Sequence, residues 1–207
     1  RAGASLGSRR AERGGRGWPA RPSRPRSPRR AGRADAGRRL GPMPTPEFVL
    51  RLREKIGHDQ LWLPGVSVVV VDDAGRILLG RRSDTGRWSI IDGIPEPGEQ
   101  PAAAAVRECE EEAGIRPEVL AVIVVEAEEP IVYPNGDRCV FLDTCFVARA
   151  GADQAATAGV GDGELTAVAW FEPDALPAPL TRHASARIAA ARAWLADPTT
   201  PARFRLR

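Results

Sequence analysis

The chain has 207 residues, of which 43% are apolar and 28% are charged, so it is long enough for one domain with a hydrophobic core and too short for two of the usual size. No apolar stretch approaches the roughly 20 residues that a membrane-spanning helix needs, so we expect no membrane partner. Three cysteines without a CxxC pair argue against a disulfide framework or a zinc site, and they favour the reducing cytoplasm as the location.

The net charge of +3 averages two unlike segments. Residues 1–42 contain 13 arginines and only two acidic residues, whereas residues 43–207 contain 17 basic and 25 acidic residues. The larger segment is therefore acidic, which argues against nucleic acid as a partner.

Residues 1–42 are rich in Arg, Gly, Pro and Ser and carry few large apolar side chains, so we expect them to be disordered. Three interpretations stay open: a basic arm that binds RNA, a targeting peptide, or a translated extension without function upstream of Met43. Met43 is the only methionine in the chain, and it stands where globular sequence begins.

A short amphipathic helix is predicted from Pro46, with Gly57 ending it. Strands are expected at about 66–72 and 76–80, with a turn between them, and a short strand at about 88–91 leads into a loop.

A helix over about 101–113 comes next, with Pro101 in its first turn and Gly114 ending it in the left-handed conformation. The remaining elements are strands at about 118–127 and 138–149, a mobile Ala/Gly-rich loop at 150–163, a strand at 165–171 and a helix at about 182–196.

Strands interleaved with two substantial helices indicate the α/β class, in the form of an α/β/α sandwich on a mixed sheet. We place this domain at 61–197, after a helix and lead-in at 43–60 and before a basic C-terminal tail at 198–207.

Three glutamates gather on one face of the helix predicted over 101–113. Residues advance by about 100° along a helix, so Glu111 and Glu112 lie on the same face as Glu108, whereas Glu110 lies outside this group. Like charges at this spacing repel one another and weaken the helix. Bound Mg²⁺ or Mn²⁺ would relieve the repulsion, because hard cations prefer carboxylate oxygens. The alternative is an acidic face that is simply solvated.

The segment from Gly93 to Ile115 favours the metal interpretation. It carries the pattern G-x5-E-x7-R-E-U-x-E-E-x-G-U, in which U is apolar, with all seven fixed residues present and Cys109 at the first apolar position. This pattern resembles the signature of the Nudix hydrolases. Outside the pattern, the resemblance extends over roughly 62–197 as general architecture.

The resemblance implies a Mg²⁺-dependent hydrolase in which water attacks a phosphorus of a pyrophosphate. Glu99 would support the site through metal-bound water or through Arg107, and Arg107 would hold a carboxylate in orientation. Carried over by position, the metal ligands would be Glu108, Glu111, Glu112 and the carbonyl oxygen of Gly93. Glu99 would be a further residue of the metal site.

Four residues outside the helix are further candidates. Glu164 and Asp162 lie on the loop before the last predicted strand, and Glu164 is either a general base or extra ligand, or an ordinary surface acid. Family members also use a helix glutamate as the base. Arg82 stands where a family arginine contacts substrate, although an exposed strand-end charge fits equally well. Tyr133 either stacks on a base or is a turn aromatic.

Two markers conflict about the substrate. Pro130, 15 residues after Ile115, is typical of family members that act on ADP-ribose, and Tyr133, 18 residues after it, of those that act on dinucleoside polyphosphates. We expect ADP-ribose or a nucleotide sugar, with (deoxy)nucleoside triphosphates or dinucleoside polyphosphates as the alternative. Two rivals are a non-catalytic nucleotide-binding module and an RNA-end pyrophosphohydrolase that uses the basic arm. The sequence leaves open whether the chain forms a homodimer.

Overall fold

The structure is a computed structural model that describes residues 45–133, 135–161 and 163–204. The predictions for residues 1–42 and for Asp162 lie outside the described residues. The helices are α1 (Glu47–Ile56), α2 (Pro101–Ala113), α3 (Ala152–Thr157) and α4 (Ala184–Ala196). The strands are β1 (Leu61–Asp72), β2 (Ile77–Arg82), β3 (Trp88–Ser89), β4 (Ile91–Gly93), β5 (Glu118–Ala127), β6 (Ile131–Val132), β7 (Arg138–Ala150), β8 (Leu165–Phe171) and β9 (Arg203–Phe204).

All of these strands join one mixed sheet. The main path has the order β3-β2-β1-β7-β5-β9, and β4 pairs with β1, β6 with β7 and β8 with β2. At the centre, β1 and β7 run parallel from Leu61 opposite Cys139 to Asp72 opposite Ala150. The neighbouring pairs β1–β2 and β5–β7 are antiparallel.

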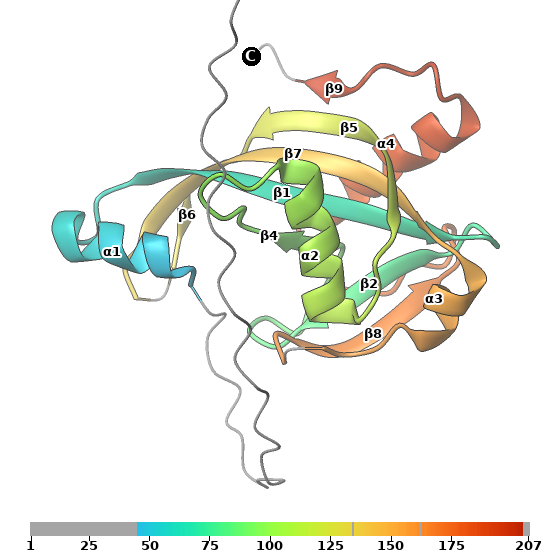
Figure 1. The fold of residues 1–207 in the computed structure, drawn as a ribbon, viewed down its shortest axis with the longest axis horizontal. Coiled ribbons are helices and arrows are strands. Elements are labelled where there is room, and N and C mark those ends of the chain that lie inside the picture. The colour runs from blue at the N-terminus through green and yellow to red at the C-terminus, as the bar shows by residue number, and fades with distance from the viewer. Residues whose placement is uncertain (1–44, 134, 162, 205–207) are drawn as a thin grey trace, which may run out of the picture. The chain divides into compact units, whose positions relative to one another are not determined.

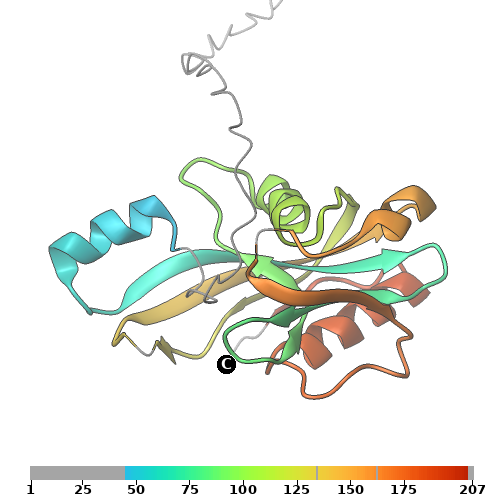
Figure 2. The ribbon, with the colours of Figure 1, turned by 90° about the horizontal axis from the view of Figure 1, so that it is seen from below.

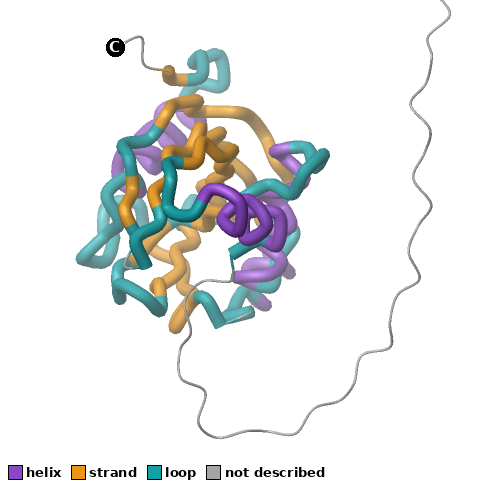
Figure 3. The backbone as a smooth tube through the Cα atoms, turned by 90° about the vertical axis from the view of Figure 1, so that its left-hand side faces the viewer, coloured by secondary structure: helices purple, strands orange, loops and turns teal. Residues whose placement is uncertain are grey.

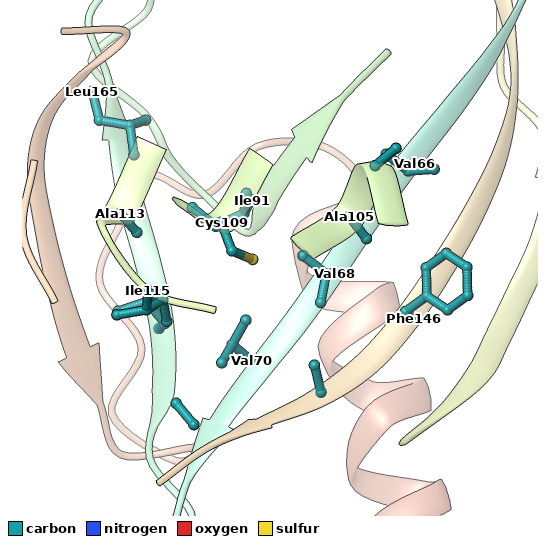
Figure 4. Packing of buried hydrophobic residues seen from close by; sticks show 14 residues of the cluster. Val66, Val68, Val70, Ile91, Ala105, Cys109, Ala113, Ile115, Phe146 and Leu165 are labelled. Atoms are coloured by element: carbon teal, nitrogen blue, oxygen red, sulfur yellow. The ribbon is translucent and has the colours of Figure 1, made fainter. Parts of the chain in front are cut away.

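Helices α2 and α4 lie on opposite faces of the sheet (Figures 1, 2 and 3). The alternation of side chains along β1 explains this arrangement, because successive residues of a strand point to opposite faces. On one face, Val66, Val68 and Val70 pack with Ala105 and Cys109 of α2 (Figure 4). On the other face, Val69 and Val71 belong to a second cluster that includes Ile188 and Ala191 of α4. The predicted α/β/α sandwich is confirmed.

Helix α1 packs on a third, smaller apolar cluster at the far end of β1. Val49 is buried there together with Leu63 and Cys139, and the helix ends at Gly57, as predicted. No helix in the described segments is long and apolar enough to span a membrane.

The structure matches the ranges predicted for α2, β5 and β8 and departs from the prediction elsewhere. Strand β1 begins at Leu61, five residues before the predicted start, because it continues to pair with β7. Strands β6 and β9 were not predicted. The prediction of a loop at 150–163 is wrong in part, because α3 forms within this segment. The indole Nε1 of Trp170 donates a hydrogen bond of 3.0 Å to the carbonyl oxygen of Ala155 in α3.

Candidate active site

The sequence of α2 explains where this helix begins and ends. Pro101 occupies the first turn, where its missing N–H has no helical partner to lose. Four consecutive alanines follow, and alanine is the best helix former. At the other end, Gly114 has a φ of 70°, and its N–H donates to the carbonyl oxygen of Glu110 at 3.1 Å. The predicted left-handed end is therefore present.

A close approach at Gly93 fixes α2 against β4. The carboxyl group of Glu108 lies where a side chain at position 93 would start, since a Cβ there would be 2.1 Å from Glu108 Cδ. Any side chain at this position would displace the carboxyl group or the helix that carries it. The structure therefore brings Glu108 and the backbone of Gly93 together, two groups that the sequence pattern places in one site.

Arg107 connects three glutamates. Its Nε and Nη2 donate to the two carboxylate oxygens of Glu99, both at 3.0 Å, and its Nη1 donates to Glu111 at 2.9 Å. Nη1 also lies 2.9 Å from Oε1 of Glu108, and Nη2 donates to the carbonyl oxygen of Ile94 at 3.2 Å. The planar guanidinium group thus fixes the loop before α2 relative to the carboxylates on the helix.

Burial and charge set the chemistry of this cluster. Burial raises the pKa of Glu108 to about 7, against the opposing effect of Arg107. Hydrogen bonds from Arg107 lower the pKa of Glu99. Glu112 is only 5% exposed, whereas the side chain of Glu111 is 49% exposed. Carboxylates outnumber the arginine around which they gather, so the cluster favours a cation.

The predicted ligand set fits a hard divalent cation by its chemistry, because it consists of carboxylate oxygens and one carbonyl oxygen. Within the described segments, however, no three acidic, histidine or cysteine side chains are arranged to hold a metal ion. Glu108 and Glu111 are both bonded to Arg107. A cation at this site would therefore compete with Arg107 for these two carboxylates.

A small pocket opens beside Glu112. The structure brings together here three residues that the sequence singled out separately, Arg82, Glu112 and Glu164, and the pocket is completed by Ser83, Asp84 and Leu165. Arg82 donates to both carboxylate oxygens of Asp84, at 3.0 and 2.9 Å, and its Nη1 lies 3.5 Å from Asp92. Arg82 is therefore engaged with protein carboxylates at the edge of the acidic cluster.

Tyr133 belongs to the apolar cluster that α1 covers. It packs with Val49, Leu63 and Cys139, and burial raises the pKa of its hydroxyl to about 12. A half-buried ring has less free surface for stacking on a base than an exposed loop aromatic has. The substrate-binding role of Tyr133 stays a prediction.

A buried polar network that we did not predict lies between the sheet and α4. Arg187 of α4 is 5% exposed, its Nη2 lies 2.9 Å from Oδ2 of Asp143 in an ion pair, and the same nitrogen donates a hydrogen bond to Glu128. The hydroxyl of Ser67 donates to Asp143 at 2.8 Å. The strand period carries the signal for this network, because Asp143 stands two residues before buried Cys145 and therefore points to the same inner face.

Asp143 should make the free energy of unfolding depend on pH. Burial raises the pKa of Asp143 to about 6, although Arg187 opposes the shift. The folded protein therefore binds more protons than the unfolded chain between about pH 4 and pH 6, and its stability falls as the pH rises through this window. A shift of this size corresponds to roughly 3 kcal/mol.

The measurement is urea unfolding of the wild type and Asp143→Asn at pH 4 and pH 6.5. The wild type should lose roughly 2 kcal/mol more than the variant over this interval, since at pH 4 part of the unfolded chain is already protonated at Asp143. Parallel losses in the two proteins would contradict the assignment of a raised pKa to Asp143.

Comparisons with known proteins agree with the fold. A family model described as the NUDIX domain matches residues 61–192. An RNA pyrophosphohydrolase of Roseobacter denitrificans is 37% identical over 91 residues, which cover 43% of this chain and 51% of that protein. A MutT-like protein of Streptomyces ambofaciens is 35% identical over 109 residues, which cover 53% of this chain and 63% of that protein. The matches thus span between half and two thirds of the length of these relatives.

Solved structures give the same fold. The crystal structure of an ADP-ribose pyrophosphatase from Streptococcus suis has a TM-score of 0.52 with this chain at 19% sequence identity. That match covers 69% of this chain and 98% of the other.

Proposed function

The chain belongs to the Nudix family, and on that premise we propose that it is an enzyme that hydrolyses the pyrophosphate bond of a nucleoside diphosphate linked to another group. The observation that carries this proposal is the convergence of Glu99, Glu108 and Glu111 on Arg107, beside the close approach of Glu108 to Gly93. A solvated acidic face would not require a helix carboxylate to be packed against a glycine or to share an arginine with a loop.

We propose Mg²⁺, with Mn²⁺ as a substitute, as the cofactor. Glu108, Glu111, Glu112 and the carbonyl oxygen of Gly93 would hold it, and Glu99 would act through its hydrogen bonds to Arg107. When bound, the divalent cation neutralises charge on the phosphate oxygens and activates water.

The other residues of the site act on the nucleophile and the substrate. Glu164 shares a pocket with Glu112, which supports a role in accepting a proton from the attacking water or in adding a further oxygen ligand. Arg82 lies in the same pocket, and its guanidinium group could pair with a phosphate of the substrate. Substrate phosphate would then compete with Asp84 for the Arg82 guanidinium.

We propose ADP-ribose or another nucleotide sugar as the substrate, and a small molecule rather than nucleic acid as the partner. The acidic balance of residues 43–207 supports this choice, because an RNA-binding surface is usually basic. The three free cysteines are all buried, and we keep the reducing cytoplasm as the proposed location.

The test is a comparison of kcat/KM with Mg²⁺ on five substrates: ADP-ribose, a nucleotide sugar, a dinucleoside tetraphosphate, dGTP and an RNA 5′-triphosphate. ADP-ribose or the nucleotide sugar should give the highest value. A preference for RNA that falls steeply with salt would favour the RNA-end reaction instead. Binding of a nucleotide without turnover of any substrate would favour a non-catalytic module.

Arg107→Lys should weaken binding of Mn²⁺ by about tenfold, because residues that hydrogen-bond to metal ligands typically contribute about 10–100-fold to the affinity. Lysine keeps the positive charge but cannot hold both oxygens of Glu99 together with the carbonyl oxygen of Ile94, so the loop that leads into α2 would lose its orientation toward the metal ligands. Mn²⁺ titration followed by electron paramagnetic resonance measures the change. Arg116→Lys is the matched control, because Arg116 pairs with Glu110, outside the cluster. Equal affinities of the two variants would argue against an orienting role for Arg107.

A further inference from the structure

The loop between α3 and β8 rests on the C-terminal end of α2. The N–H of Gly159 donates to the carbonyl oxygen of Ala113 at 3.0 Å, and the N–H of Gly161 donates to that of Glu112 at 2.9 Å. The last carbonyl groups of a helix have no partner within the helix, so the loop satisfies acceptors that α2 leaves open. One of these acceptors belongs to a residue of the acidic cluster.

Gly161 makes the closest approach in this contact. A Cβ at this position would lie 1.9 Å from the carbonyl oxygen of Glu111 and 2.9 Å from its carbonyl carbon. Gly161 is not among the glycines with positive φ, so its backbone conformation is open to other residues. Lack of space, not backbone conformation, therefore requires glycine here.

Two further contacts fix the backbone at Glu164. Its own carbonyl oxygen accepts a hydrogen bond of 2.9 Å from the N–H of Ser83 in the turn after β2. The next residue, Leu165, is 5% exposed and packs on Gly80, where a Cβ would lie 2.3 Å from Leu165 Cδ1. Gly161 thus holds the chain against α2 three residues before Glu164, Leu165 holds it one residue after, and Glu164 lines the pocket beside Glu112.

We propose that Gly161 is a positioning residue of the active site, which docks the loop on the end of α2 and so places Glu164 beside Glu112. This inference rests on the proposed function of Glu164. A methyl group at position 161 must move the loop away from α2, because the atoms it would meet are backbone atoms of a helix. Displacement of a catalytic group by about 1 Å can reduce turnover up to about 100-fold.

The test compares Gly161→Ala with Gly159→Ala, a matched control in the same loop. A Cβ at Gly159 would meet only the carbonyl oxygen of Thr157, at 3.9 Å, so this variant keeps its hydrogen bond and should retain kcat within about twofold. Gly161→Ala should lower kcat by about tenfold and leave KM within about twofold, because the loop acts on the chemical step. A wild-type kcat for Gly161→Ala would overturn the proposal.

A double-mutant cycle shows whether Gly161 acts through Glu164. If it does, Gly161→Ala should reduce kcat no further once Glu164→Gln is present, because the group that it positions is already lost. If the double variant instead showed the product of the two single reductions in kcat, Gly161 would act independently of Glu164, and the proposal would be overturned.

Amide hydrogen exchange of the wild-type protein tests the docking without any variant. The amides of Gly159 and Gly161 should exchange as slowly as those in the last turn of α2, and Gly161→Ala should make both faster. Fast exchange at Gly161 in an active wild type would overturn the docking. Protected amides in a wild type that turns over no substrate would instead refute the proposed function and the role of Glu164, and leave the docking intact.

Discussion

Replacing Glu112 by glutamine is expected to lower Mg²⁺-dependent turnover by about 1,000-fold or more while the protein stays folded. Glutamine has nearly the same shape but lacks the charge that makes a carboxylate a ligand for a hard cation. Bound metal contributes several kcal/mol to the transition state, and about 4 kcal/mol corresponds to roughly 1,000-fold in rate. The effect should be this large because Glu112 is only 5% exposed and lines the pocket that also contains Arg82 and Glu164, so that solvent cannot easily replace its carboxylate as a ligand.

Glu110→Gln is the matched control, because Glu110 lies on the same helix, pairs with Arg116 and stands outside the cluster. It removes the same charge from α2 and should retain turnover within about twofold. Circular dichroism and thermal unfolding of both variants establish that they are folded. If Glu112→Gln kept the wild-type rate, the helix carboxylates would not form the active site.

Replacing Glu164 by glutamine is expected to lower kcat by about 100-fold, because a positioned general base typically contributes 10²–10⁴-fold. The backbone at Glu164 is anchored by the bond from Ser83 to its carbonyl oxygen and by the buried side chain of the next residue, Leu165, which supports a fixed position for this carboxylate in the pocket. A base and a ligand give different signatures: loss of a base lowers kcat at unchanged affinity for Mn²⁺, whereas loss of a ligand weakens Mn²⁺ binding as well.

The control for Glu164 is Glu118→Gln, at the exposed beginning of β5. It should leave both the rate and the affinity for Mn²⁺ unchanged. If Glu164→Gln matched this control in both measurements, Glu164 would be an ordinary surface acid, and the base would have to be sought among the glutamates of α2.

Local chemistry made part of this fold predictable. Pro101 and Gly114 mark the two ends of α2, and the helical period places Glu108, Glu111 and Glu112 on one face while Glu110 turns away to Arg116. The residue pattern from Gly93 to Ile115 led to the family, because its seven fixed positions combine loop and helix in a single signature.

The rest depends on contacts between residues far apart in the chain. The parallel pairing of β1 with β7 joins segments about 80 residues apart, and no turn or spacing encodes it. The sequence around Arg187 is an ordinary alanine-rich helix, and only the fold brings Asp143 and Glu128 into contact with this arginine. The need for glycine at position 161 likewise follows only from its contact with the end of α2, which the sequence does not predict.

The measurement that tests the central claim most directly is a ³¹P NMR time course of the wild-type protein with each of the five substrates, first with Mg²⁺ and then with excess EDTA. We predict that the pyrophosphate signals of ADP-ribose or the nucleotide sugar are replaced by two phosphomonoester signals with Mg²⁺, and that they persist with EDTA. Pyrophosphate signals that persist for all five substrates with Mg²⁺, or that disappear equally fast with EDTA, would contradict metal-dependent hydrolysis by this site.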